Sequence, residues 1–246
     1  MESVKPKAFF QLCEERELSK NPVLTFLPPS QIGSIRSIEA AVMVALIRLI
    51  DARLILEIGT YKGFTTSILA MNSHPDAVIY SVDLPRESFP YVTLNINEVL
   101  VDGNTNDKFL IEEQFRDEEV YCKLLDPEYY RRIRLLKVDS TKLDFGKILD
   151  STEFFDLIFI DGGHDYKTAL SDSSKALSTK GKQTVILWHD YDSSLHTEVS
   201  RVIEDLSAQY PIYAIAGTSF AIFLPEYLCN LLKNSSSGGA KDQRRT

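Results

Sequence analysis

The segment LILEIGTYKGFTT, residues 54–66, decides the fold. Its first five residues are a short apolar run interrupted by one Glu, which is typical of a buried parallel strand. Gly59 and Gly63 follow four residues apart, and residues 65–71 can continue as a helix. A strand, a glycine-containing turn and a helix bring backbone N–H groups up to a ligand. We therefore expect either a ligand-binding turn, where a Cβ would keep the ligand off the backbone, or glycines needed only for tight packing.

The glycine spacing argues against a dinucleotide site. The dinucleotide fingerprint needs G-x-G-x-x-G, whereas this segment contains G-x-x-x-G. Glu57 lies two residues before the first glycine. Its carboxylate would repel a pyrophosphate and would accept a ligand that carries an ammonium group.

Composition limits the class of protein. The chain has 246 residues, of which 44% are hydrophobic, enough for one α/β domain with extensions. A formal net charge of −8 argues against a nucleic-acid partner. No apolar run is long enough to cross a bilayer and the N-terminus lacks the core of a signal peptide, so we expect no membrane contact and a cytoplasmic location. Three widely spaced cysteines indicate reduced thiols. The chain could also form a homo-oligomer.

Apolar segments alternate with helical patterns along the chain, which predicts an α/β fold with a doubly wound, mostly parallel, Rossmann-like sheet of seven strands. A C-terminal antiparallel hairpin is expected at 212–216 and 219–224. The five predicted parallel strands are 54–58, 77–83, 133–139, 155–161 and 183–188.

A regular apolar face predicts a helix from Ser37 to about Asp51, with Ser37 as its N-cap and Glu39 in its first turn. We expect residues 1–36 to be an N-terminal extension that could cover an acceptor site, and 37–228 to be the main domain. Within that domain, 85–130 is longer than a strand–helix connection needs, which suggests a partly helical lid. Residues 229–246, rich in Ser, Gly and charges, are expected to be a disordered tail.

Acidic residues recur where the predicted parallel strands end. Glu57, Asp83, Asp139, Asp161 and the pair His189–Asp190 lie at or just before these carboxyl ends. Ligands bind outside the carboxyl ends of such strands. A single acidic residue there is usually a cap or a turn residue, but the repetition predicts one functional crevice.

These segments together resemble class I S-adenosylmethionine-dependent methyltransferases, and more narrowly the small-molecule O-methyltransferases that act on sugars and macrolides. The resemblance implies an enzyme that moves a methyl group from S-adenosylmethionine to a hydroxyl of a small molecule, which could be a sugar, a polyketide or a phenol-like compound. The segments that carry it are LEIGTYKG (56–63), YSVD (80–83), VDS (138–140), FIDGGHDY (159–166) and LWHD (187–190).

The resemblance also assigns cofactor contacts. Gly59 and Gly63 would lie at the methionine part, and Glu57 would help to hold its amino end, directly or through a water molecule. Asp83 would accept both ribose hydroxyls, and Asp139 with Ser140 would lie at the adenine edge. The complete set of expected cofactor-binding residues is Glu57, Gly59, Tyr61, Gly63, Thr65, Asp83, Asp139, Ser140 and Asp161.

Catalysis then needs a base for the acceptor hydroxyl. His164, with Asp161 three residues before it, is the candidate base, although a histidine next to Asp165 could also be a plain turn residue. The resemblance implies a divalent cation such as Mg²⁺ at Asp161 and Asp190. The chain departs from the pattern at His189, where an acidic ligand is expected, and His189 could be the base or a softer metal ligand.

Three other functions stay open. One is aminopropyl transfer on the same scaffold, which Glu57 disfavours because it suits an intact amino acid end. Another is an NAD-linked oxidoreductase, which the missing glycine fingerprint disfavours. The third is a non-catalytic relative that binds the cofactor or a partner protein.

Overall fold

A computed structural model describes residues 1–18, 22, 33–85, 88, 110, 123, 125–149 and 153–238, with 233–238 described by their backbone alone. Most of the 85–130 segment lies outside these residues, so its proposed role as a lid stays a prediction. Cys13 and Cys229 are free thiols, as expected, and Cys122 lies outside the described part.

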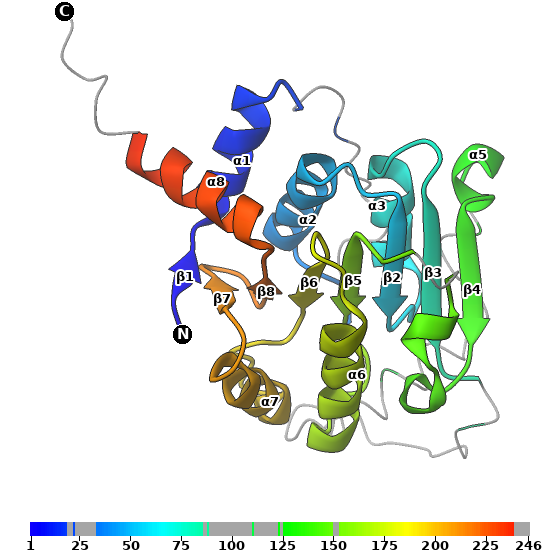
Figure 1. The fold of residues 1–246 in the computed structure, drawn as a ribbon. Helices are drawn as coiled ribbons and strands as arrows, with labels where there is room; N and C mark the ends of the chain where they lie inside the picture. The colour runs from blue at the N-terminus through cyan, green and yellow to red at the C-terminus, as the bar shows by residue number, and fades with distance from the viewer. Residues whose placement is uncertain are drawn as a thin grey trace, which may run out of the picture.

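Within the described residues the fold is built on an eight-stranded sheet in the order β1-β7-β8-β6-β5-β2-β3-β4 (Figure 1). β8 is antiparallel to β6 and β7, and the other neighbouring pairs are parallel. The predicted α/β sheet and its hairpin are confirmed, with β1 as an additional strand. The strands are β1 (Ser3–Val4), β2 (Leu54–Ile58), β3 (Val78–Asp83), β4 (Ile133–Lys137), β5 (Leu157–Ile160), β6 (Val185–Trp188), β7 (Ile212–Ile215) and β8 (Ala221–Phe223).

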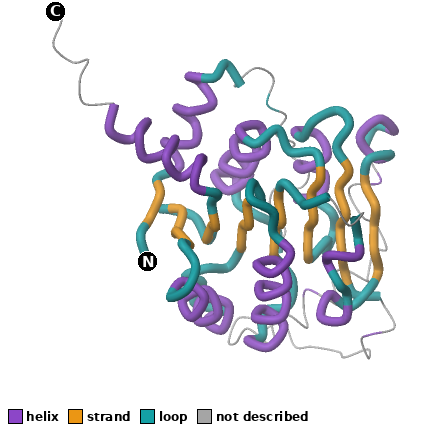
Figure 2. Tube along the Cα trace, viewed as in Figure 1, coloured by secondary structure: helices purple, strands orange, loops and turns teal. Residues whose placement is uncertain are grey.

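Helices cover both faces of the sheet, as Figures 1 and 2 show. Buried apolar side chains form one cluster on each face. The first face carries α1 (Pro6–Glu15), α2 (Ser37–Leu49), α3 (Phe64–Asn72) and α8 (Glu226–Gly238), and the second carries α6 (Tyr166–Thr179) and α7 (Thr197–Ser207). The short helices are α5 (Pro127–Tyr130), η3 (Ser140–Lys142) and η4 (Phe145–Lys147).

Strand β2 shows how the sequence produces this layering. Successive side chains of a strand point to opposite faces. Leu56 and Ile58 join the cluster under α6 and α7, whereas Ile55 joins the cluster under α2 and α3. A strand buried on both sides needs apolar residues at successive positions, and residues 54–58 have them everywhere except at Glu57.

The two chain ends differ from expectation. Of the tail expected at 229–246, residues 229–238 belong to helix α8, and 239–246 lie outside the described residues. Leu228 and Leu232, which are 0% and 2% exposed, lie one helical turn apart and join the core, so an apolar stripe anchors this helix. At the other end, β1 pairs with β7 and α1 packs against α2 and α8. Residues 1–18 therefore pack as part of the main domain.

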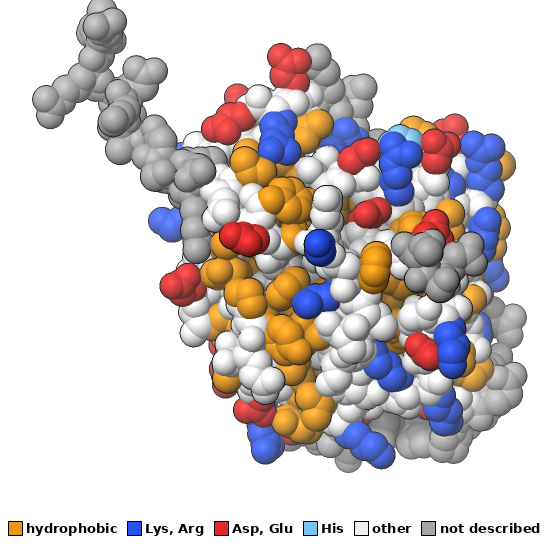
Figure 3. Space-filling view, in the orientation of Figure 1, with side chains coloured by type: hydrophobic (Ala, Val, Ile, Leu, Met, Phe, Trp, Pro, Cys, Tyr) orange, Lys and Arg blue, Asp and Glu red, His pale blue; other side chains and the backbone are white. Residues whose placement is uncertain are grey.

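The surface carries charges of both signs. Figure 3 shows Lys, Arg and acidic side chains spread over one face, with hydrophobic side chains grouped among them toward its middle. None of the described helices is long and apolar enough to cross a membrane.

Candidate active site

A cleft of about 960 Å³ lies at the carboxyl ends of β2, β3, β5 and β6. The sheet register sets its floor, because Ile58 is level with Val82 on one side and Ile160 on the other, and Ile160 is level with Trp188. The residues that follow these positions therefore reach the same rim. The predicted site residues on the cleft wall are Gly59, Tyr61, Thr65, Asp83, Asp139, Ser140, Asp161, His164, His189 and Asp190.

The glycine turn is shaped mainly by backbone packing. Gly59 has φ +98°, and a Cβ built on it would lie 1.8 Å from the carbonyl oxygen of Asp161. The close approach of the loop after β5 is thus one reason for glycine here, and the expected contact of Gly59 with a ligand stays a prediction. Gly63, with φ +79°, begins α3 as its N-cap and does not line the cleft. Tyr61 between them also has a positive φ of 46°, an uncommon conformation for a non-glycine residue.

Glu57 lies beneath the turn and not on the cleft. Its side chain is 0% exposed and Oε2 accepts hydrogen bonds of 2.5 Å from the hydroxyls of Ser81 and Thr66. Oε1 is buried without a hydrogen-bond partner. Burial raises the pKa of Glu57 to about 8, against the lowering effect of the two hydroxyls. The alternation along β2 points Glu57 toward α3, so its side chain does not line the cleft, and its expected help in holding the amino end of the cofactor stays a prediction.

Asp83 closes β3 as expected and lines the cleft. Its Oδ1 accepts a hydrogen bond of 2.8 Å from the backbone N–H of Leu84. Oδ2 lies 3.4 Å from Nζ of Lys137 on the neighbouring strand β4. The carboxylate is thus fixed at the strand end, where it can accept hydrogen bonds from a ligand in the cleft.

Asp139 and Ser140 form the next part of the wall. Asp139 is the N-cap of η3 and accepts from the backbone N–H of Thr141 at 3.0 Å and from its hydroxyl at 2.6 Å. The hydrogen bond from the Thr141 hydroxyl is the main cause of the lowered pKa of Asp139. The hydroxyl of Ser140 donates to Asp172 Oδ2 at 2.9 Å. Burial raises the pKa of Asp172 to about 6, and this side chain, which holds Ser140 in place, was not predicted.

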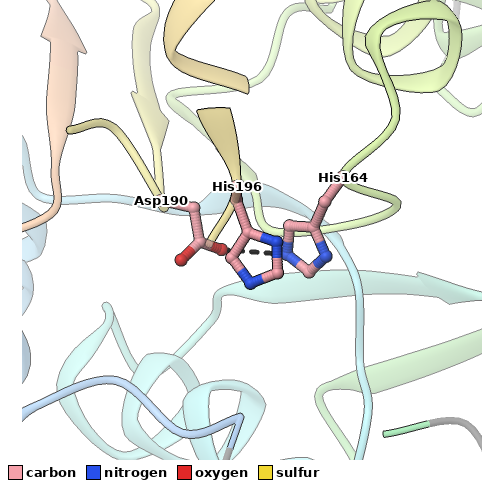
Figure 4. Close-up of side chains that lie close together, drawn as sticks. All are labelled: His164, Asp190 and His196. Carbon is pink, nitrogen blue, oxygen red and sulfur yellow. Dashed lines mark hydrogen bonds and ion pairs between the residues drawn. The ribbon is translucent and has the colours of Figure 1, made fainter. Parts of the chain in front are cut away.

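His164, Asp190 and His196 form a group at the opposite wall (Figure 4). His164 Nε2 lies within hydrogen-bond distance, 2.9 Å, of Asp190 Oδ2. The ring of His164 stacks on that of His196 with centroids 3.8 Å apart and planes 24° from parallel. Asp190 itself has a positive φ of 59°. One carboxylate and one ring thus fix the orientation of His164.

His189 lies between carboxylates. Its Nδ1 is 3.1 Å from Asp161 Oδ1 and 3.1 Å from Asp190 Oδ2, and its Nε2 is 3.5 Å from Glu39 Oε2. Neither 3.1 Å contact has the direction of a hydrogen bond, so both are electrostatic contacts. Burial would lower the pKa of His189, but Asp161 and Asp190 raise it well above its ordinary value. In turn, burial would raise the pKa of Asp190, but His189 and His164 hold it well below its ordinary value.

Glu39 supports this group from α2. It is 0% exposed, and its carboxylate accepts from the backbone N–H of Arg36 at 2.7 Å, from the Arg36 side chain at 2.5 Å and from the backbone N–H of Ser219 at 2.7 Å. Burial would raise its pKa, but the contacts with His189, Arg36 and Ser219 lower it to about 2. Arg36 is the N-cap of α2, so the helix begins at Ser37 and is not capped by it.

The sequence of the chain matches a protein family across this site. The profile of the family described as "Methyltransferase domain" matches residues 56–191, more than half of the chain. The chain belongs to the methyltransferase-domain family. The resemblance to class I methyltransferases is therefore confirmed. No curated protein sequence matches the chain.

Solved methyltransferases share the fold at low sequence identity. The O-methyltransferase from Bacillus cereus in complex with S-adenosylhomocysteine is 15% identical, with 89% of this chain and 90% of that chain covered and a TM-score of 0.50. The S-adenosylhomocysteine-bound methyltransferase PaMTH1 from Podospora anserina is 13% identical, covering 92% and 90%, with a TM-score of 0.50. Calicheamicin methyltransferase CalS11 is 13% identical, covering 89% and 91%, with a TM-score of 0.51.

The described residues of this methyltransferase fit S-adenosylmethionine as the family cofactor. The cleft volume of about 960 Å³ is in the range of small-molecule sites. Strands β3 and β4 lie on one side of β2, and the next strand along the chain, β5, lies on its other side. This switch in strand order is the place where such sheets bind ligands. Asp83 and Asp139 offer carboxylates along one wall, and the group of histidines lies at the other.

Sequence reasoning missed Glu39, His196 and Asp172 as members or supports of the site. Glu39 carried a signal, because it is a lone carboxylate in an otherwise apolar helix segment, SIEAAVMVALIRL. A charge inside an apolar run is costly unless it is paired, so its partner had to be sought elsewhere in the chain. For His196 and Asp172 no comparable local signal exists.

Proposed function

We propose that this methyltransferase moves the methyl group of S-adenosylmethionine to a hydroxyl of a small molecule, such as a sugar, a polyketide or a phenol-like compound. The observation that carries the proposal is a pair, His164 and Asp190, on the wall of the cleft that the strand-end carboxylates share. The solved structures that share the fold include CalS11, described as a TDP-rhamnose 3′-O-methyltransferase. This supports a hydroxyl as the acceptor.

The chemistry asks little of the protein, because the sulfonium of the cofactor is a good leaving group. The methyl carbon leaves sulfur and bonds to the acceptor oxygen, the sulfonium becomes a neutral thioether, and the hydroxyl proton goes to a base. His164 is the proposed base, since a neutral imidazole can accept a proton near neutral pH. Asp190 holds one ring nitrogen of His164, as the acidic member of a catalytic triad orients its histidine.

Cofactor binding is proposed for Gly59, Tyr61, Thr65, Asp83, Asp139, Ser140 and Asp161, all of which line the cleft. Asp83 would accept the ribose hydroxyls and Asp139 with Ser140 would border the adenine. A divalent cation at Asp161 and Asp190 would supply a charge that lowers the pKa of the acceptor hydroxyl. A small-molecule partner in place of a nucleic acid agrees with the net charge of −8. The cytoplasmic location and a homo-oligomer stay predictions.

The test is transfer of a labelled methyl group from S-adenosylmethionine to a panel of nucleotide sugars, macrolides and phenols. We expect label on the oxygen of at least one acceptor. His164→Ala should lower kcat by about 10²–10⁴-fold, the usual contribution of a general base, while S-adenosylhomocysteine binds with unchanged affinity. An unchanged kcat would assign the base to another residue, and label found only on nitrogen or carbon would contradict the hydroxyl acceptor.

A further inference from the structure

Both ring nitrogens of His189 lie near carboxylates, and methyl transfer alone does not explain this arrangement. Nδ1 faces Asp161 and Asp190, and Nε2 faces Glu39. At this position the chain places a ring nitrogen next to two carboxylates.

The atoms around Nδ1 are spaced like the ligands of one cation. Nδ1 lies 3.1 Å from Asp161 Oδ1 and 3.1 Å from Asp190 Oδ2. Ligands about 2.1 Å from a cation and at right angles to each other are roughly 3 Å apart. Nδ1 is also buried without a hydrogen-bond partner, although two acceptors are near it. A nitrogen equally distant from two carboxylate oxygens, and hydrogen-bonded to neither, fits a ligand that all three atoms share.

Glu39 fits the other end of the ring. A histidine that binds a metal almost always donates its second ring N–H to a carboxylate or carbonyl, which fixes the ring orientation. Glu39 Oε2 lies 3.5 Å from His189 Nε2, and its carboxylate is held ionised by Arg36 and by the backbone N–H of Ser219. Glu39 is 0% exposed and belongs to α2, so the support for the His189 ring comes from a helix and not from the loops that carry the other site residues.

The surroundings add further imidazole nitrogens. His164 and His196 lie next to Asp190, and the three could together offer a ligand set of their own. Imidazole nitrogen suits Zn²⁺, Cu²⁺, Fe²⁺ and Ni²⁺, whereas Mg²⁺ prefers carboxylate, carbonyl and water oxygen.

We propose that Asp161, His189 and Asp190 form a site for a divalent first-row transition metal in preference to Mg²⁺, with Glu39 as the positioning residue for His189. This rests on the proposed function for its place in the reaction, but the binding itself does not. The competing occupant is a proton on His189, whose imidazolium could balance the two carboxylates without any metal.

The experiment is a calorimetric titration of the chelator-treated full chain with Co²⁺ and with Mg²⁺, together with the visible absorption spectrum of the Co²⁺ form. We expect Co²⁺ to bind at least about 10-fold more tightly than Mg²⁺ and to give ligand-field bands. Glu39→Gln should weaken Co²⁺ binding by about 10–100-fold, the usual effect of losing such a supporting carboxylate. Glu226→Gln is the matched control, because Glu226 is also a first-turn helix glutamate but is exposed.

A second variant keeps the test decisive if Glu39→Gln fails to fold. His189→Asp replaces the nitrogen with oxygen and should shift the preference toward Mg²⁺. Equal affinity of the wild type for the two metals, binding of neither, or equal Co²⁺ affinity of the Glu39→Gln and Glu226→Gln variants would overturn the proposal. The titration contains no cofactor or acceptor, so a failure of methyl transfer with Co²⁺ binding intact would count against the proposed function alone.

Discussion

Burial gives Glu57 a structural role that its place in the sequence motif does not indicate. The resemblance assigns its carboxylate to the cofactor, but the side chain is fully buried below the glycine turn and bonded to Ser81 and Thr66. With a pKa raised to about 8 by burial, it is mostly protonated at pH 7. Its part in the site is therefore to hold β2, β3 and α3 together.

The raised pKa predicts a pH dependence of stability. The ordinary pKa is 4.5 and the folded one about 8, so the folded state binds the proton more tightly. Stability from this group is fully present below pH 4.5 and is lost as pH rises through 8. Relative to Glu57→Gln, the wild type should lose more than about 1 kcal/mol of unfolding free energy between pH 5 and pH 8. Urea unfolding of both proteins at the two pH values measures this, and parallel pH profiles would contradict it.

Some site residues could be predicted one by one and others could not. Asp83, Asp161 and His189 end short apolar runs, and a local pattern is enough to place them on the rim of a parallel sheet. Glu39 reaches the same group from a helix far away in the chain, and His196 reaches it from the loop that follows Asp190. Their roles depend on tertiary contacts, which no local spacing encodes.

At the scale of elements, the turn between β2 and α3 packs closely against its neighbours. Gly59 packs against the backbone after β5, and Gly63 begins α3 in a left-handed conformation. The strand–turn–helix order was predictable because each part has its own local signal. The need for glycine at position 59 was not predictable, because the backbone that it packs against, at Asp161, lies about a hundred residues later.

Gly59→Ala should therefore be strongly destabilising. The added Cβ meets the Asp161 carbonyl at 1.8 Å and the residue also has to keep φ +98°. Gly217→Ala is the matched control, since Gly217 has φ +77° but no atom within 4 Å of the added Cβ. We expect a loss of about 1–2 kcal/mol for Gly217→Ala from the left-handed conformation, and a larger loss for Gly59→Ala. Equal shifts of the thermal unfolding midpoint would show that the Asp161 backbone yields easily.

At the scale of the whole molecule, the elements near both chain ends pack onto the main domain. β1 extends the sheet past β7, and α1 and α8 pack together on the face that also carries α2 and α3 (Figure 1). Composition suggested a tail from residue 229 because Ser and Gly dominate beyond residue 234. The apolar stripe that anchors α8 is short, and a two-residue strand has no pattern of its own, so neither element could be read reliably.

Anchoring by α8 predicts that its buried leucines matter for stability. Leu228→Ala should lower the free energy of unfolding by about 2–5 kcal/mol, the range for removing a buried leucine side chain. Tyr227→Ala changes the neighbouring residue, which is 40% exposed, and should cost much less. Denaturant unfolding of both variants is the measurement. Similar small losses would mean that α8 adds little to the core.

The central claim concerns the ligand of the cleft, and calorimetric titration with S-adenosylhomocysteine tests it most directly. We expect the wild type to bind S-adenosylhomocysteine and not NAD. Asp83→Ala should weaken binding by about 1–3 kcal/mol for lost hydrogen bonds to a charged group. Asp76, whose side chain is 83% exposed, lies just before the other end of β3, and Asp76→Ala should bind like the wild type. Binding of NAD alone, or equal affinity of the Asp83→Ala and Asp76→Ala variants, would contradict the account.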